Sequence, residues 1–387
     1  MATISPIPEA NRSIAKDQSP STACQSETLQ SGRVSRIIQI HPTLNCNLCC
    51  QHCYSSSAPW KKGGLDVKAL VRLLEQATPL GYNVVSLSGG EPFLYRELEE
   101  LLTQSRSLGY YNSVTTNAML LQTDRVKRIL KLLDLVAVSI DGKEEAHDRM
   151  RNQEGAFAKM LEGLEVIKDS VKKYGFIHTI LPGNWRLFTW LTEFAIGHKA
   201  SLLHLHPLEL SGRATQSFNG ISFSEEDLYK IYISHYYLKT YYEKELFLQL
   251  DLLHKDNIIG NPNFIFHQYD RPALTPQSFS SLFKELIIDE KGDLLPIAHG
   301  CSPFFTIGSI YSGEPLEEMI GRFMEEKLDA VIDLYNDTYN EILEDKSREI
   351  FNWSERVIEK SYINIPSTPT IRPPRPEPSL SNSAPSR

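Results

Sequence analysis

The sequence predicts an α/β fold: a partial (β/α)6 barrel of the TIM type, followed by a smaller α+β lobe. Strand-like runs alternate with helical patterns whose apolar residues recur at i, i+3 and i+4. This alternation predicts a parallel sheet with right-handed crossovers, which places chemistry at the carboxyl ends of the strands. The strands are expected at 36–40, 83–87, 112–115, 135–140, 176–181 and 202–206, and the helices at 67–77, 97–108, 124–132, 156–173 and 187–198.

The pattern changes after Gly220. A long Tyr-rich helix is expected from 224 to about 245, then a strand at 247–253, a hairpin at 286–295 and a helical region from about 315 to 360. We therefore assign 33–223 to the barrel and 224–363 to the smaller lobe.

Both ends of the chain have a biased composition. Residues 1–32 are rich in Ser, Gln, Pro and Ala without periodicity, which predicts a disordered leader. Residues 364–387 contain seven of the 22 prolines, which predicts a disordered Pro-rich tail.

Composition and charge exclude several classes of protein. The chain of 387 residues has 40 Lys plus Arg against 48 Asp plus Glu, a net charge of −8, and no basic stretch interleaved with aromatic residues. We therefore expect no nucleic-acid partner. No apolar run approaches the roughly 20 residues that span a bilayer, and the first 30 residues lack the apolar segment of a signal peptide. The expected location is the cytoplasm, with no membrane partner.

The distribution of the six cysteines indicates a metal site. Cys24 and Cys301 stand alone, but four others fall within eight residues: Cys46, Cys49, Cys50 and Cys53. A disulfide framework would spread its cysteines to close long loops. Clustered thiols in a reducing compartment favour metal binding instead.

The spacing Cys46-x3-Cys50-x2-Cys53 offers three thiolates from one loop directly after the first strand. Thiolates hold iron–sulfur clusters, and three ligands on a four-iron cube leave one iron open. A zinc ribbon is the alternative, but its two Cys pairs are normally separated by roughly 15–20 residues, whereas here they abut. The ferredoxin spacing also fails, since three residues separate Cys49 from Cys53. Cys49 is then expected to pack as a small apolar side chain.

This loop, with Asn45, Asn47, His52 and Tyr54 beside the cysteines, resembles the radical S-adenosylmethionine (SAM) superfamily. Within it, the chain is similar to the SPASM-like maturases of ribosomally made peptides (RiPPs), with a reduced C-terminal lobe. The resemblance runs from about 34 to 214. It implies a [4Fe–4S] cluster on Cys46, Cys50 and Cys53, and S-adenosyl-L-methionine at the open iron. It also implies cleavage to a 5′-deoxyadenosyl radical that takes a hydrogen atom from a substrate.

The resemblance also implies a set of cofactor contacts at strand ends. Gly89-Gly90-Glu91-Pro92 corresponds to the family's GGEP motif, whose backbone and Glu hold the methionine amino group. Arg151 is the expected partner of the methionine carboxylate, with a surface salt bridge as its alternative. Asp141 is either a contact or a helix cap, and His206 faces the cofactor or substrate unless it is ordinary loop packing. The full expected set is Tyr54, Gly89, Gly90, Glu91, Pro92, Thr116, Asn117, Ser139, Asp141, Arg151 and His206.

Cys301 is the one cysteine of the smaller lobe, so we expect no auxiliary cluster there. As a thiol it is a candidate hydrogen-atom donor to a substrate radical, and the alternative is a buried apolar cysteine. The expected substrate is a precursor peptide, modified by splicing, epimerisation or crosslinking. The expected partners are a separate leader-peptide-recognition protein and an electron donor such as flavodoxin or ferredoxin. A small metabolite or a protein side chain is the alternative substrate, and a non-catalytic metal-binding scaffold is a distant alternative.

Overall fold

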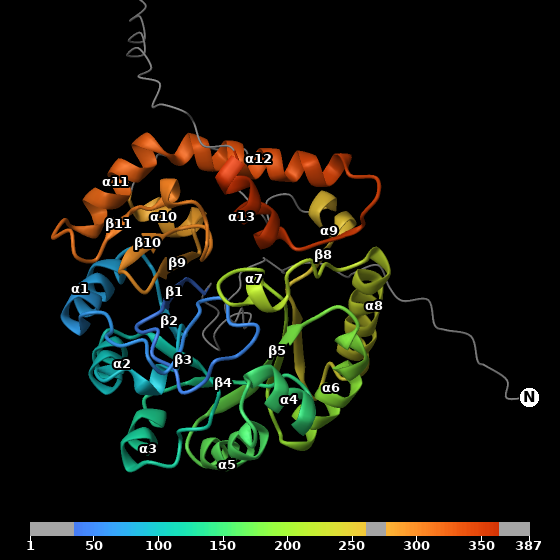
Figure 1. The fold of residues 1–387 in the computed structure, drawn as a ribbon. Coiled ribbons are helices and arrows are strands. Elements are labelled where there is room, and N and C mark those ends of the chain that lie inside the picture. Colours follow the sequence, from blue (N-terminus) through green and yellow to red (C-terminus); the bar gives the residue numbers. More distant parts are fainter. Residues whose placement is uncertain (1–34, 261–275, 364–387) are drawn as a thin grey trace, which may run out of the picture.

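A ten-stranded sheet organises the computed structural model, which describes residues 35–260 and 276–363. Figure 1 shows how the helices lie around its strands. The strand order is β11-β10-β9-β1-β2-β3-β4-β5-β6-β7. Strands β1 to β6 pair in parallel, as the sequence predicts for a partial barrel, and β7, which lies in the segment assigned to the smaller lobe, continues the parallel pairing. Their bounds are Ile37–Ile40, Val84–Leu87, Tyr111–Thr116, Leu135–Ser139, Lys173–Ile180, Leu202–Pro207 and Phe247–Leu250.

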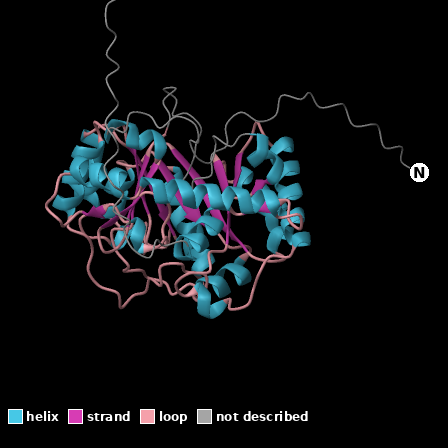
Figure 2. Cartoon of the chain, turned by 90° about the horizontal axis from the view of Figure 1, so that it is seen from above, coloured by secondary structure: helices cyan, strands magenta, loops and turns pink. Residues whose placement is uncertain are grey.

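Helices connect these strands and lie outside the sheet, as the view from above shows (Figure 2). They bury one apolar side each: in α1, Val67, Leu70, Leu74 and Ala77 are all buried, and Asp66 caps the first turn. The helices of this part are α1 (Val67–Ala77), α2 (Leu98–Ser107), α3 (Asp124–Leu130), α4 (Glu144–Arg151), α5 (Ala156–Lys168), α6 (Phe188–Gly197), α7 (Ala214–Ser217) and α8 (Glu225–Tyr241).

The C-terminal part of the chain extends the same sheet. Strand β9 (Glu285–Ile288) pairs in parallel with β1, and β10 (Asp293–Leu295) and β11 (Gly308–Ser309) follow antiparallel. Strands on both sides of the expected boundary at 223/224 therefore belong to one sheet. The remaining elements are β8 (Leu253–His254), α9 (Lys255–Gly260), α10 (Pro276–Leu282), α11 (Leu316–Glu326), α12 (Leu328–Glu344), β12 (Ile350–Phe351) and α13 (Trp353–Ile363).

Two expectations for the helices of the barrel differ from the structure. The helix expected at 156–173 ends at Lys168, because the chain turns at Ser170 and Val171 and strand β5 already begins at Lys173. Helix α4 has no counterpart among the expected helices. Its buried residues are His147 and Arg151, so it has no apolar stripe that a hydrophobic pattern can detect.

The expected leader at 1–32, with Cys24, and the expected tail at 364–387 lie outside the described residues. Within the described ranges, none of the helices combines the length and apolar character needed to cross a membrane.

Two helical glycines test how tightly the helices pack on the sheet. A Cβ added at Gly163 in α5 would lie 1.8 Å from the carbonyl oxygen of Ala118, whereas one added at Gly197 in α6 would meet nothing within 4 Å. We expect Gly163→Ala to lower the free energy of unfolding by about 1–3 kcal/mol through overpacking. Gly197→Ala should be neutral or stabilising by up to about 1 kcal/mol. Urea denaturation measures both, and equal effects of the two substitutions would contradict this packing.

Candidate active site

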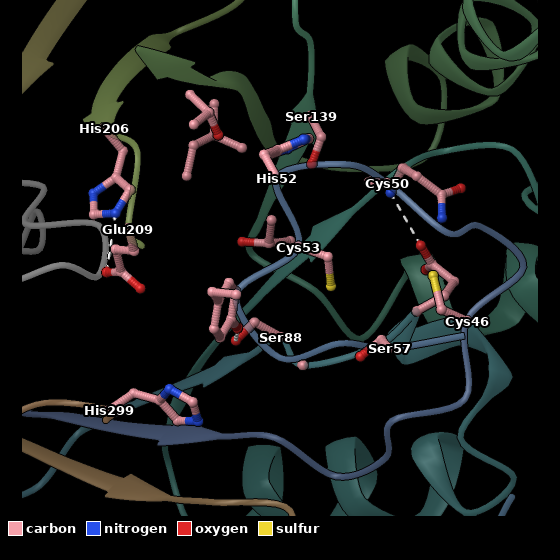
Figure 3. A pocket seen from close by; sticks show the side chains of 18 of the residues that line it. Cys46, Cys50, His52, Cys53, Ser57, Ser88, Ser139, His206, Glu209 and His299 are labelled. Carbon is pink, nitrogen blue, oxygen red and sulfur yellow. Dashed lines mark hydrogen bonds and ion pairs between the residues drawn. The ribbon is translucent and has the colours of Figure 1, made fainter. Parts of the chain in front are cut away.

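A cavity of about 220 Å³ opens where the parallel strands end (Figure 3). Strands β1, β3 to β6 and β9 and the loops after β1 and β2 contribute residues to it, as expected at the carboxyl ends of a parallel α/β sheet. Most residues that the sequence singled out line this cavity: Cys46, Cys50, Cys53, Tyr54, Gly89, Gly90, Glu91, Thr116, Asn117, Ser139, Arg151 and His206. The others, Pro92, Asp141 and Cys301, lie outside its lining.

The three cysteines of the predicted ligand set reach the cavity from one loop, and Cys49 does not. Cys46 and Cys50 are buried, and Cys53 is partly buried. Burial raises the pKa of the Cys46 thiol to about 12 and also raises that of Cys50. Because burial favours the neutral thiols, metal binding here would release protons. Three converging thiols with a fourth turned away fit a cluster held by three protein ligands.

Backbone contacts hold the cysteine loop against the end of β2. The amide of Gly90 donates to the carbonyl of Thr43 at 2.8 Å, and the amide of Glu91 donates to that of Asn45 at 2.9 Å. A Cβ on Gly90 would lie 2.3 Å from the Asn45 carbonyl oxygen, so the approach requires glycine. The Gly-Gly pair therefore positions the loop as well as lining the cavity.

Arg213 holds the other side of the same loop. Its guanidinium donates to the carbonyl oxygens of Cys50 at 2.9 Å and Ser57 at 2.8 Å, and its amide donates to that of Cys53 at 2.9 Å. Arg213 follows strand β6, and these contacts are all with the backbone of the cysteine loop. The sequence around Arg213 does not indicate this role, because the role depends on contacts with Cys50, Cys53 and Ser57, far away in the chain.

The carboxylate of Glu91 joins the ends of β2 and β3. It accepts hydrogen bonds from the Thr116 hydroxyl at 2.8 Å and from the amides of Asn117 at 3.0 Å and Phe93 at 3.3 Å. Burial raises the pKa of Glu91 to about 7, although these hydrogen bonds oppose the rise. Asn117 in turn donates to the Asn47 side chain at 2.9 Å, which connects β3 to the cysteine loop.

Arg151 lies between Asp141 and Cys50. Its Nε is 2.6 Å from Asp141 Oδ2, and its Nη1 donates to Cys50 Sγ at 3.7 Å. Burial alone would raise the pKa of Asp141, but the charge of Arg151, helped by His52 and His147, lowers it to about 2. Asp141 therefore acts as the counter-ion of Arg151 in this structure, and the arginine brings a positive charge to a thiol of the loop.

A second group of polar side chains surrounds His206, which lines the cavity together with Glu209. Asp251 Oδ2 lies 2.8 Å from His206 Nδ1 and 2.6 Å from His204 Nε2, and Glu209 lies 3.1 Å from His206 Nε2. Burial alone would lower the pKa of His206, but Asp251 and Glu209 outweigh it and raise the pKa to about 10. Asp251 was not singled out from the sequence, because it follows a short strand in the C-terminal part.

Cys301 is 5% exposed and lies apart from the cavity lining. Burial raises the pKa of its thiol to about 12, against a hydrogen bond with Ser361 of α13. Its neighbours in sequence, Ala298 and His299, do line the cavity. A donor role for Cys301 stays a prediction, and this placement favours the packing alternative.

Residues 40–185 match the family model described as "Radical SAM superfamily". The segment includes the three cysteines, the Gly-Gly pair and Arg151.

Curated relatives share part of this chain. Fe-coproporphyrin III synthase of Methanosarcina barkeri is 29% identical over 179 residues, which are 46% of this chain and 45% of that protein. PqqA peptide cyclase of Methylocella silvestris is 32% identical over 120 residues, 30% of this chain and 32% of that protein. The chain spans about half the length of the first curated relatives it matches.

The fold is similar to that of anSMEcpe, whose structure was solved with bound AdoMet. The TM-score is 0.56 at 16% identity, over 85% of this chain and 92% of that one. At this identity the likeness concerns the fold, and it extends beyond residues 40–185 into the C-terminal part.

The four clustered cysteines allow a direct test of the loop. Cys50→Ala removes a thiol from the cavity, so we expect anaerobically reconstituted protein to lose its cluster. Cys49→Ala, the matched control, removes a neighbouring thiol outside the cavity and should retain about four irons per chain. Iron and sulfide analysis with the ultraviolet–visible spectrum measures both. About eight irons in the unmodified chain, or a protein that binds zinc alone, would contradict a single [4Fe–4S] cluster.

The His206 group predicts a pH-dependent stability. Because folding raises the pKa of His206 from about 6.5 to about 10, its contribution is fully present below pH 6.5 and is lost as the pH rises toward 10. At low pH the unmodified chain should therefore have a higher free energy of unfolding than His206→Gln. This difference should shrink by more than about 1.4 kcal/mol, the energy of one pKa unit, as the pH rises from 6.5 to 10. Anaerobic urea titrations at pH 6 to 10 measure it, and a constant difference would show that His206 is not held as the cation.

Proposed function

Because residues 40–185 belong to the radical SAM superfamily, we propose that this chain is an enzyme that cleaves S-adenosylmethionine and abstracts hydrogen from a precursor peptide. The cofactors of the family are a [4Fe–4S] cluster and S-adenosylmethionine. When held by Cys46, Cys50 and Cys53, a reduced cluster would supply the electron for cleavage of the sulfonium bond to the 5′-deoxyadenosyl radical. The main observation in support of the proposal is that Cys46, Cys50 and Cys53 line one cavity at the strand ends.

In this proposal some residues of the chain bind the cluster, and others position or stabilise those that do. In this proposal Cys46, Cys50 and Cys53 hold the cluster, and Arg151 stabilises the thiolate of Cys50 through its charge. Glu91 uses its carboxylate to hold the ends of β2 and β3. The exposed edge of the Gly89–Gly90 backbone is then the part of the motif that meets the methionine amino group.

The remaining cavity residues form the cofactor and substrate walls. Ser139, Thr116 and Asn117 lie at the ends of β3 and β4 and line the cavity. In this proposal Ser139 and Asn117 contact polar parts of the cofactor, and the hydroxyl of Thr116 supports Glu91. Tyr54 and His206 also line the cavity. In this proposal they face the substrate, where exclusion of water would protect a reactive radical.

A peptide substrate is favoured by the similarity of the cysteine loop to that of RiPP maturases and by the PqqA peptide cyclase match. A small metabolite is the second candidate, because Fe-coproporphyrin III synthase is also a relative, over a longer part of the chain. The proposed partners are a separate protein that recognises the leader of the peptide, and flavodoxin or ferredoxin as the electron donor.

One experiment tests both the chemistry and the substrate. Reduced, reconstituted protein should release 5′-deoxyadenosine from S-adenosylmethionine well above a Cys46→Ala control. With a deuterated precursor peptide encoded beside the gene, deuterium should appear in the 5′-deoxyadenosine by mass spectrometry. Deuterium transfer from a labelled porphyrin and not from the peptide would favour the second candidate. No 5′-deoxyadenosine from protein with an intact reduced cluster would refute the enzyme itself.

A further inference from the structure

Three potential metal ligands gather beside the cavity, on the β1–β9 side of the sheet. His41 follows β1, Glu290 lies in the turn between β9 and β10, and His299 lies in the loop after β10. One ring nitrogen of each histidine and one carboxylate oxygen of Glu290 lie within 4.8 Å of one another. His299 also lines the cavity (Figure 3).

The sheet itself places two of these residues. Ile40 pairs with Ile288 across β1 and β9, and the amide of His41 donates to the carbonyl of Ile288 at 2.9 Å. Glu290 follows two residues later, so the register brings it to the level of His41. Ligands carried by paired strands are held more precisely than ligands on free loops.

The His41 ring has no complete set of partners among the described residues. It is 0% exposed, and its Nδ1 makes no hydrogen bond there. Its Nε2 lies 3.4 Å from the Tyr54 hydroxyl and 3.0 Å from the side-chain amide of Gln39. A buried ring nitrogen without a partner is costly, and metal-bound histidines commonly use their second nitrogen for such a hydrogen bond.

The charges of the group suit a cation. Burial lowers the pKa of His41 to about 3, so its ring is neutral and has a lone pair to donate. Glu290 is ionised, because the neighbouring His299 lowers its pKa to about 2. The contact between them is loose, with His299 Nε2 3.9 Å from Glu290 Oε2, which leaves the carboxylate available for a closer ligand.

The group around Asp251 offers similar donors but is already satisfied. His204, His206 and Asp251 also lie within 4.8 Å of one another. There, however, the carboxylate lies 2.6 and 2.8 Å from the two rings, and Glu209 occupies the other nitrogen of His206. An ion would have to break these contacts. The unsatisfied ring therefore distinguishes the His41 group from the Asp251 group.

We propose that His41, Glu290 and His299 bind one divalent transition-metal ion, Zn²⁺ or Fe²⁺, at the wall of the cavity. Two imidazoles and one carboxylate are the donors that both ions accept. Three protein ligands leave at least one coordination position open, which is the arrangement of a metal that binds a substrate oxygen. The site joins His41 of the core to two residues of the C-terminal part, and it does not depend on the proposed radical chemistry.

Zinc binding to the full chain tests the site. The chain is reconstituted with iron and sulfide so that the cluster occupies the cysteines, then dialysed against Zn²⁺, and zinc and iron are counted by mass spectrometry. We expect one zinc per chain in addition to the iron. Glu290→Gln and His299→Asn, both at partly exposed side chains, should each weaken zinc binding at least about tenfold, since even loss of a partner of a ligand costs about 10–100-fold.

Two control variants locate the ion. His254→Asn changes a histidine that also lies near a carboxylate, 3.7 Å from Asp256, and should keep the zinc. His204→Asn should keep it as well. Loss of zinc in His204→Asn with retention in His299→Asn would assign the ion to the Asp251 group and overturn the proposal. No zinc beyond the cluster, or zinc unaffected by both Glu290→Gln and His299→Asn, would also overturn it.

A spectroscopic measurement on a variant without the three cavity cysteines tests the site in the absence of competing thiol ligands. In the variant with Cys46, Cys50 and Cys53 all changed to Ala, Co²⁺ should give visible bands of nitrogen and oxygen ligation without thiolate charge-transfer absorption. Adding His299→Asn should remove those bands. Bands that persist would contradict the site. Because neither measurement involves S-adenosylmethionine cleavage, this result is separate from the test of the radical enzyme.

Discussion

The close approach of the Gly89–Gly90 turn to the cysteine loop is the constraint on which the candidate site depends. The loop carries four thiols, three of which line the cavity, but few apolar side chains of its own, so its shape comes from contacts with its neighbours. Gly90 and Glu91 hold it through the carbonyls of Thr43 and Asn45, and Arg213 holds the opposite side. A side chain on Gly90 would force these backbones apart and spread the thiols with them.

The barrel and its cavity could be predicted from the sequence because both have local signals. Helix α1 was predicted with the bounds it has, since Asp66 caps it and its apolar residues keep the helical period. The cysteine spacing and the Gly-Gly turn are likewise contained in short segments. Because the carboxyl ends of parallel strands meet at one edge of the sheet, the residues that follow these strands are expected to lie close together.

Interactions between distant segments could not be predicted in this way. The pairing of Arg151 with Asp141 and the contacts of Arg213 depend on how α4 and the β6 loop fold back on the cysteine loop. Asp251 and Glu290 lie in the C-terminal part, and the pairing of β6 with β7 and of β1 with β9 brings them beside His206 and His41. Asp141 was given two possible roles, and its neighbour Arg151, ten residues away, determines the contact it makes.

The pairing of β1 with β9 also has a consequence for how the chain acquires its structure. Ile37, in the first strand, takes Glu285 as its neighbour on one side, so that edge of β1 has no β9 to pair with until residue 285 has been synthesised. Contacts so distant in sequence slow folding, and an apolar strand with a free edge is open to pairing with other chains. A chain synthesised only as far as α8 therefore leaves this edge of β1 open to other chains, and slow translation before β9 would prolong that state.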